Sequence, residues 1–310
     1  MSKALNTPND ITSISFLEKE VNCNLEHTKN KAEYFINNTK ELRSLLANYY
    51  RSIGKYNQAV SISQCGTFLM FKEYKNKEKT AILEKANFCK NPLCPMCAWR
   101  KHIILERQLK YAVQKNTDKY FYHLVLAVPN TNYIDRAILM RLKERGKTFI
   151  QQKLNIQSYF SSMEIKYSEK GYHPHLHILF STNEFINISS QYIKNMAEKW
   201  KKHYNKFDKK YKTYTFYLQG VKKDDDGLFQ ELTKYVVKSD GIRATKQNVG
   251  ELAEAIYKIR KISAGGSLKA DLKAGKELAL NDYADYVRAL NEYEWEYKIL
   301  QFINGKYEEK

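Results

Sequence analysis

The sequence predicts an α+β fold, in which helices flank an antiparallel sheet, with a cysteine-rich, zinc-like segment before it and a mostly helical part after it. Two observations predict this class. The middle of the 310-residue chain alternates apolar, strand-like runs with amphipathic helical stretches. Two of the strand-like runs, 159–167 and 175–180, are joined by the short, turn-like segment SEKGYHP, so we expect them to pair as antiparallel neighbours.

The predicted elements divide the chain into four segments. These are a helical N-terminal arm over 1–55, a cysteine-rich zinc-binding segment with its helix over 56–115, the sheet-containing core over 116–245, and a helical C-terminal region over 246–310. The expected strands cover 60–72, 79–89, 120–128, 159–167, 175–180 and 213–218. The expected helices are one or two over 16–51, then 98–115, 133–154, 191–203, 228–238 and a last long helix from Asn281, after a break at Gly265-Gly266-Ser267.

Charge and composition favour a polyanionic partner. The chain has 52 Lys and Arg against 34 Asp and Glu, a net charge of +18, and it contains 24 Tyr and 14 Phe. Lysines neutralise phosphates, and aromatic rings stack on unpaired bases. An AT-rich genome would also enrich Lys and Tyr, without any functional demand. No apolar run approaches the ~20 residues of a membrane helix, and the first residues lack a secretory apolar stretch, so we expect a cytoplasmic protein with no membrane role.

The run His173-Pro174-His175-Leu176-His177 is the first candidate site. Side chains alternate along a strand, so His175 and His177 point to the same face. Glu164 lies on the preceding strand and would join them if the hairpin register allows it. Two imidazoles and a carboxylate suit a divalent cation such as Mg²⁺ or Mn²⁺ that binds a phosphate oxygen. The competing interpretation is a chance cluster of histidines in a polar strand.

The run Gln230 to Lys238, in the predicted helix 228–238, is the second candidate site. Glu231, Tyr235 and Lys238 lie four and three residues apart, so they share one helical face. Tyrosine is mostly protonated at neutral pH and needs help to attack phosphorus. Lysine stabilises a developing phenolate or the phosphate, and glutamate is a base for water. An ordinary surface helix has the same spacing, so this pattern alone does not decide the function.

A cysteine cluster is the third feature. Cys94 and Cys97 form a C-x-x-C pair in a Pro-containing knuckle, and Cys89 and Cys65 complete four thiolates. This pattern predicts a structural zinc site, with His102 as the alternative to Cys65. The alternative interpretation is a redox-active pair of Cys94 and Cys97, but the sequence around them lacks a thioredoxin-like pattern. Cys23 is then a free thiol outside the zinc site.

A basic strip from Lys201 to Lys223 is the fourth feature. It contains eight lysines and one acid, Asp208, interleaved with aromatic residues. A solvated helix end would also be rich in lysine, but the mixture of lysine and tyrosine favours a DNA track. The expected DNA-binding residues are Lys201, Lys202, Lys209, Lys210, Lys212, Tyr211 and Tyr214.

Taken in order, three runs resemble the motifs of rolling-circle replication initiators of the HUH endonuclease superfamily. They are the strand ending Val128-Pro129-Asn130, the HPHLH run from His173, and the ELTKYVVK run from Glu231. The segment FCKNPLCPMCAWR, from Phe88, resembles the branch encoded by small multicopy bacterial plasmids. The resemblance covers roughly 60–245. Relatives commonly carry threonines in the first motif, where this chain has His123-Leu124-Val125-Leu126-Ala127, so we assign no catalytic role to that strand.

The resemblance implies an RNA-recognition-like antiparallel sheet that carries the metal ligands His175 and His177, with Glu164 as the third. It implies that Tyr235 nicks one strand of the plasmid's double-strand origin, keeps the 5′ phosphate covalently and frees a 3′ hydroxyl. Glu231 would activate water to end the round, and Lys238 matches the lysine of the third motif.

The partners expected from this resemblance are double-strand origin DNA, single-stranded DNA, and a host helicase and polymerase, with a second copy of the chain as a further candidate. No phosphate-binding G-x-x-x-x-G-K-[ST] loop occurs in the sequence, in keeping with a transfer that needs no nucleotide cofactor. The alternatives are an HUH-type transposase and a non-catalytic, zinc-stabilised DNA-binding regulator.

Overall fold

The computed structural model describes residues 25–310 except 77–79, 117–118, 206–213, 223–225 and 234–245. The chain forms two compact units, one made of Met1–Ile104 with Lys276–Lys310 and the other of Leu105–Gly275. Each unit contains an antiparallel sheet and helices, which confirms the predicted α+β class. Among the described residues, no helix combines the length and apolar character that crossing a bilayer requires.

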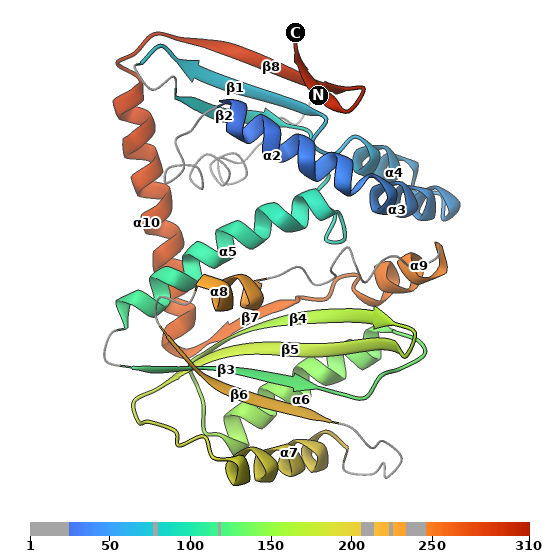
Figure 1. The fold of residues 1–310 in the computed structure, drawn as a ribbon, viewed down its shortest axis with the longest axis vertical. Helices are drawn as coiled ribbons and strands as arrows, with labels where there is room; N and C mark the ends of the chain where they lie inside the picture. The colour runs from blue at the N-terminus through green and yellow to red at the C-terminus, as the bar shows by residue number, and fades with distance from the viewer. Residues whose placement is uncertain (1–24, 77–79, 117–118, 206–213, 223–225, 234–245) are drawn as a thin grey trace, which may run out of the picture. The chain divides into compact units, whose positions relative to one another are not determined.

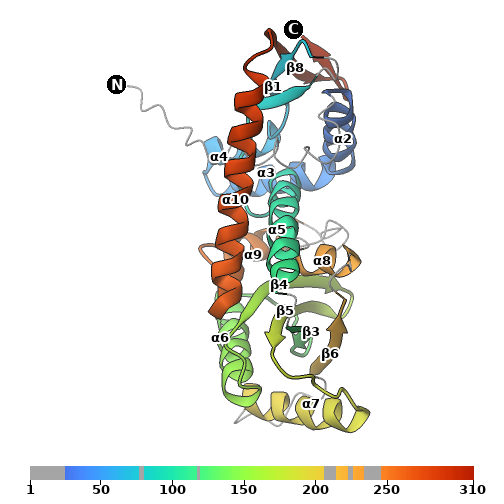
Figure 2. The same cartoon turned by 90° about the vertical axis from the view of Figure 1, so that its left-hand side faces the viewer.

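The first unit contains a four-stranded sheet in the order β2-β1-β8-β9. Helix α2 packs one face of it, where Ile36 meets Leu69 and Phe71 in the core (Figure 2). The strands are β1 Phe68–Tyr74, β2 Ala81–Ala86, β8 Trp295–Ile303 and β9 Lys306–Glu309. The helices are α2 Leu25–Asn38, α3 Lys40–Ser52, α4 Tyr56–Ser63, the start of α5 Pro95–Lys115 and the end of α10 Gly266–Leu290.

The secondary structure predicted for this part of the chain differs from the observed one in three places. The strand expected over 60–72 begins only at Phe68, because α4 runs to Ser63 and a turn follows it. The C-terminal region contains the expected helices, α9 and α10, but it also contains β8 and β9, which the sequence did not predict and which form a hairpin that pairs with β1. The run WEYKILQFI shows no regular alternation of buried and exposed side chains, and its partner strand lies more than 200 residues earlier. The last long helix begins at Gly266, not Asn281.

The second unit contains a five-stranded antiparallel sheet in the order β6-β3-β5-β4-β7 (Figure 1). The hairpin of β4 and β5 confirms the predicted antiparallel pairing, with a tighter turn than expected, at Glu169-Lys170. The strands are β3 Tyr120–Ala127, β4 Tyr159–Ser168, β5 Gly171–Thr182, β6 Thr215–Val221 and β7 Ile262–Gly265. The helices are α6 Arg136–Lys153, α7 Ser190–Tyr204, α8 Asp226–Thr233 and α9 Lys246–Ala255, besides the remainder of α5 and α10.

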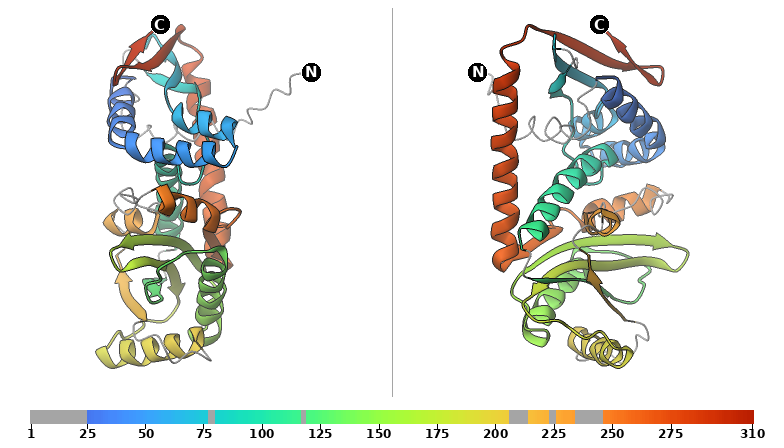
Figure 3. Two further views of the ribbon diagram at one scale, coloured as in Figure 1. Left: turned by 90° about the vertical axis from the view of Figure 1, so that its right-hand side faces the viewer. Right: turned by 60° about the vertical axis from the view of Figure 1, so that its left-hand side comes forward.

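Helices cover both faces of this sheet, which is why β5 is buried along nearly its whole length. On one face lie α6 and α7 (Figure 3), where Gly146 of α6 approaches Leu176 closely and Trp200 of α7 donates a hydrogen bond to the Ala127 carbonyl at 3.0 Å. On the opposite face, α5 and α8 pack against Phe121 and Phe160. The predicted helices 133–154 and 191–203 are thereby confirmed as α6 and α7, and each begins after a side-chain cap.

Candidate metal centres

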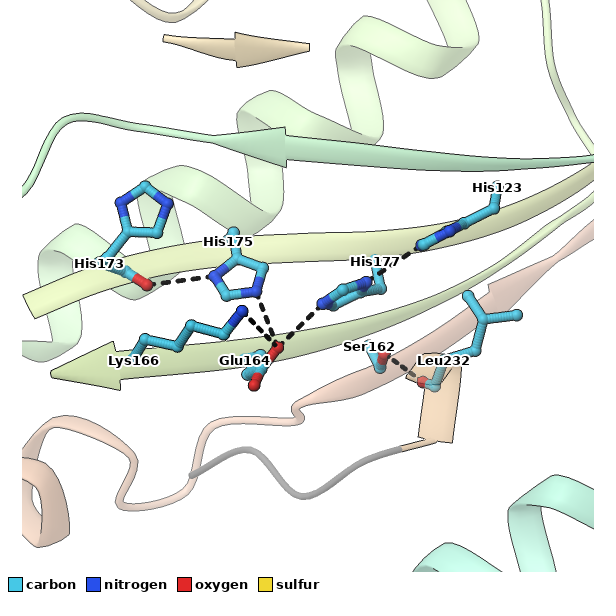
Figure 4. A network of polar contacts seen from close by, with 8 residues as sticks. All are labelled: His123, Ser162, Glu164, Lys166, His173, His175, His177 and Leu232. Carbon is cyan, nitrogen blue, oxygen red and sulfur yellow. Dashed lines mark hydrogen bonds and ion pairs between the residues drawn. The ribbon is translucent and has the colours of Figure 1, made fainter. Parts of the chain in front are cut away.

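Glu164, His175 and His177 lie together on the sheet face that α5 and α8 cover (Figure 4). The register of the hairpin places Glu164 opposite His175, and opposed residues in an antiparallel pair share a face. Both His175 Nε2 and His177 Nε2 approach Glu164 Oε2, at 2.8 and 3.0 Å. All three side chains are buried. The hairpin register therefore allows Glu164 to join the two histidines, as the sequence analysis required.

The electrostatics of this triad favour a cation. Burial alone would raise the pKa of Glu164, but hydrogen bonds from His175 and His177, with the charges of His175 and Lys166, hold that pKa well below its usual range. The three potential ligand atoms lie within 4.8 Å of one another. A carboxylate oxygen and two imidazole nitrogens at this spacing fit one divalent cation and leave positions open for phosphate oxygens or water.

The sequence analysis missed His123, which lies on β3 in the first-motif strand. His123 Nε2 lies 3.0 Å from His177 Nδ1, and the two rings are nearly coplanar. A histidine that binds metal through Nε2 carries its proton on Nδ1, and a partner for that N–H fixes the tautomer. His123 supplies such a partner, and Gln219 on β6 lies 3.5 Å from its other ring nitrogen. Only the pairing of β3 with β5 could reveal this role.

The described part of helix α8 approaches the strand that carries Glu164. Ser162, opposite His177 in the hairpin register, donates a hydrogen bond from its hydroxyl to the Leu232 carbonyl at 2.5 Å. This side-chain donor holds α8 against β4. The side chains of Phe229 and Leu232 anchor the same helix in the core.

The tyrosine motif lies largely outside this description. The helix predicted over 228–238 is described as α8 only as far as Thr233. Tyr235 and Lys238 lie outside the described residues, and of Glu231 only the backbone, in α8, is described. The structure thus places the chain leading into the motif beside the triad.

Two more polar side chains border the triad. Lys166 follows Glu164 on the same face of β4, and its ammonium lies 4.0 Å from Glu164 Oε2. His173 lies opposite Lys166 and forms a hydrogen bond with the Asn130 side chain at 2.8 Å. Asn130 belongs to the predicted first motif, so the first and second motifs meet here.

In the first unit, Cys65, Cys89, Cys94 and Cys97 come together with their sulfurs within 4.8 Å of one another. Cys97 Sγ lies 3.6 Å from Cys65 Sγ and 3.7 Å from Cys89 Sγ, and all four are free thiols. With a Zn–S bond of ~2.3 Å, the sulfurs of a tetrahedral site lie about 3.8 Å apart, so the cluster fits zinc. Cys65, rather than the alternative His102, completes the group, while Cys23 lies outside the described residues.

Hydrogen bonding within the cysteine cluster shifts the pKa values of its thiols in opposite directions. Contacts with Cys89, Cys94 and Cys97 raise the pKa of Cys65, whereas contacts from Cys65 and the other two thiols lower the pKa of Cys97. The Lys90 backbone N–H also donates to Cys97 Sγ at 3.2 Å. Without a cation, four thiols this close favour a single thiolate, at Cys97, because neighbouring thiolates repel one another. A bound cation would remove this repulsion and allow all four thiols to ionise.

The predicted DNA track is only partly described. Lys201 and Lys202 lie in the last turn of α7, on the side of the sheet away from the triad. Tyr214 precedes β6 and accepts a hydrogen bond from Asn205 at 2.7 Å. Lys209, Lys210, Tyr211 and Lys212 lie outside the described residues. Within the described part, therefore, the strip borders the β6 edge and does not reach the triad.

Comparison with known proteins connects both metal centres to one family. Residues 80–308 match the family described as "Replication protein", and they include the triad, α8 and three of the four clustered cysteines. The chain is 27% identical to a protein named "Protein rep" from Streptococcus pneumoniae, over 74% of this chain and 76% of the relative. Relatives of the same name come from Staphylococcus aureus, at 32% over 48% and 68%, and from Lentilactobacillus hilgardii, at 29% over 78% and 82%. No solved structure matches the chain.

Proposed function

We propose that this chain, which belongs to the replication protein family and is a plasmid replication initiator of the Rep type, is a nicking enzyme. In this proposal, Tyr235 cleaves one strand of the double-strand origin. The proposed enzyme is a site- and strand-specific, metal-dependent endonuclease and strand transferase of the HUH superfamily. Support comes from the central position of the two-histidine, one-carboxylate triad on an antiparallel sheet.

One observation carries the proposal: the hydrogen bond between Ser162 and Leu232 ties the end of α8 to the triad. Tyr235 follows Leu232 by three residues. Three residues of fully extended chain span at most about 11 Å, so the tyrosine backbone is limited to that distance from the tied position. Because Leu232 is bound to a residue opposite His177, the chain keeps the nucleophile in the neighbourhood of the metal site, which favours phosphoryl transfer to tyrosine.

The triad residues Glu164, His175 and His177 would hold the divalent cation, Mg²⁺ or Mn²⁺. When bound, this ion supplies positive charge that polarises the phosphate. His123 would keep His177 in the tautomer whose Nε2 carries a lone pair.

In the nicking step, the phenol oxygen of Tyr235 forms a bond to phosphorus while the bond from phosphorus to the 3′ oxygen breaks. The phenol loses its proton, and the departing 3′ oxygen gains one to become a free hydroxyl. Lys238 would stabilise the phenolate or the phosphate charge. The phosphotyrosine bond conserves the energy of the phosphodiester. Termination proceeds by strand transfer and by hydrolysis, in which Glu231 would accept a proton from the attacking water.

The remaining residues would organise the complex. Cys65, Cys89, Cys94 and Cys97 would bind a structural zinc ion that stabilises the first unit. The lysines and tyrosines of the strip from Lys201 would contact the DNA. Residues 246–310 are proposed to serve origin recognition or self-association, with a host helicase and polymerase as further partners.

The test incubates the protein with supercoiled plasmid carrying its origin and Mn²⁺. We expect a nicked circle with protein attached to the 5′ end, and peptide mass mapping should place the adduct on Tyr235. Tyr235→Phe is expected to abolish nicking while DNA binding persists. A plasmid that stays closed would indicate a non-catalytic DNA-binding regulator, and an adduct on another tyrosine would refute the assignment of Tyr235.

A further inference from the structure

Six cationic side chains gather at the β7 edge of the second unit, away from the strip that begins at Lys201. They come from helix α6 and from the segment between α9 and β7. We call this group the edge cluster, and its members are Arg136, Lys143, Lys147, Lys258, Arg260 and Lys261. The unit Leu105–Gly275 contains 31 Lys and Arg against 17 Asp and Glu, so most of the excess positive charge of the chain lies here.

Hydrogen bonds to backbone carbonyls hold the edge cluster together. Arg136, Lys143 and Lys147 are seven and four residues apart, which places them on one side of α6. Arg136 donates to the Tyr257 carbonyl, and Lys143 Nζ donates to the Arg260 carbonyl at 2.7 Å. Arg260 Nε donates in turn to the Ile262 carbonyl at 3.1 Å. The folded chain thus fixes cations from two segments against each other.

Lys143, Lys147 and Arg260 of the edge cluster lie close enough to affect one another's charge. Burial lowers the pKa of Lys143, and the nearby charges of Arg260 and Lys147 lower it further, while Glu144 acts in the opposite direction. In the described part of the chain, the charged groups of Lys143 and Arg260 hydrogen-bond to carbonyls, which carry no net charge. Like charges held this close repel, and a bound anion relieves the repulsion.

The edge cluster begins next to the strand that carries Glu164. The Lys261 carbonyl accepts a hydrogen bond at 3.0 Å from the backbone N–H of Met163, the residue before Glu164. Neighbouring strands lie only ~4.8 Å apart, so the segment that carries Lys258, Arg260 and Lys261 leads into the edge strand directly beside the strand of Glu164.

The extent of the edge cluster favours a polymer over a single anion. From Arg136 to Lys147 the helix rises about 16 Å, which is more than one phosphate group can bridge. Tyr257 adds an exposed ring, 56% accessible, with the Lys258 ammonium 5.2 Å from its centre. An exposed ring beside cations suits an unpaired base stacked next to its phosphates.

We propose that the edge cluster binds the sugar–phosphate backbone of the single-stranded DNA that flanks the nick position on the β7 side. The proposal rests on the proposed function only for the presence of DNA at the triad. Binding there requires neither metal nor chemistry. The basic strip at the β6 edge and the edge cluster at the β7 edge would then bind the DNA strand on the two sides of the triad.

The test measures binding of the full-length protein to a fluorescent 30-nucleotide single strand, without metal, over a range of salt concentrations. Lys147→Ala combined with Lys258→Ala removes two exposed charges, and Lys153→Ala combined with Lys194→Ala removes two exposed charges elsewhere in the same unit. We expect the first pair to weaken binding about tenfold and to lower the salt slope by about 1.4, since each phosphate contact on a single strand contributes ~0.7. The control pair should change both values far less.

Equal losses in the two double variants would overturn the proposal, because net charge alone would then explain them. Lys143→Arg combined with Arg260→Lys keeps the charges and should retain affinity, and thermal unfolding checks that every variant is folded. Inorganic phosphate, added at constant ionic strength, should compete weakly; complete competition would assign the cluster to a small anion and reject DNA. Specific loss of binding in a protein that never nicks would keep this inference and reject the proposed function.

Discussion

Ser162 Oγ donates a hydrogen bond to the Leu232 carbonyl, and this contact joins strand β4 to the end of helix α8. Ser162 also lies opposite His177 in the hairpin register. One hydroxyl therefore links the metal triad to the chain segment that leads to the predicted nucleophile. Its removal gives the most direct test of how the two halves of the site are held together.

Ser162→Ala should slow origin nicking about tenfold without changing Mn²⁺ affinity. A lost hydrogen bond costs roughly 1 kcal/mol, and misplacing a nucleophile by a small distance lowers the rate. Single-turnover nicking and calorimetric titration with Mn²⁺ measure the two effects. Ser161→Ala is the matched control, because Ser161 is equally buried but points to the opposite face. Equal rates for the two variants would show that the contact has no part in positioning.

Glu231→Ala should still nick the origin but should release DNA poorly at termination. Without a general base, the water that ends the round is less nucleophilic. Covalent protein–DNA adduct should therefore accumulate over a round of replication, as a gel shift resistant to denaturant will show. Normal termination products from this variant would remove Glu231 from its proposed role.

His123→Ala should weaken Mn²⁺ binding by roughly 10- to 100-fold, as expected when the partner of a ligating histidine is lost. His123→Gln keeps an acceptor for the His177 N–H and should recover part of the affinity. Calorimetry on the protein without DNA gives the readout, independently of nicking. His173→Ala serves as the control, because the hydrogen-bond partner of His175 Nδ1 is the backbone carbonyl of His173, which the substitution leaves in place. Unchanged affinity in His123→Ala would exclude the role.

Cys94→Ser should abolish zinc binding and lower the melting temperature, with less effect on the chemistry of any protein that remains folded. Structural zinc contributes directly to the folding free energy of small sites. Metal analysis and thermal unfolding provide the measurements. Cys23→Ser should keep its zinc, since Cys23 is outside the predicted set. A stable Cys94→Ser protein that lacks zinc would contradict a structural role for the metal.

Gly146→Ala should lower the free energy of unfolding by about 1–2 kcal/mol. A methyl group on Gly146 would lie 2.4 Å from Leu176 Cδ1, and overpacking outweighs the better helix propensity of alanine. Leu176 separates His175 from His177, so a shift there should also weaken metal binding. Gly220→Ala meets no atom within 4 Å and should be nearly neutral. Urea denaturation compares the two, and equal stability would mean that α6 can move away without cost.

Much of the fold of the second unit was predictable, because its elements have clear local patterns. Apolar alternation located β3, β4 and β5, and helical spacing located α6 and α7. The C-terminal hairpin was missed because β8 pairs with β1, whose Leu69 lies 231 residues before its partner Leu300. No local pattern encodes a partner at that distance.

The sequence by itself determined which residues could share a face: His175 with His177, and Cys94 with Cys97. Such relationships follow from strand and turn geometry over a few residues, which local chemistry sets. The choice of Cys65 over His102 in the cysteine cluster, the contact of His123 with His177 and the hydrogen bond from Ser162 to α8 became visible only in the folded chain. These contacts join segments that lie far apart in the chain. Their geometry depends on how whole strands and helices pack against one another, and no short stretch of sequence determines that packing.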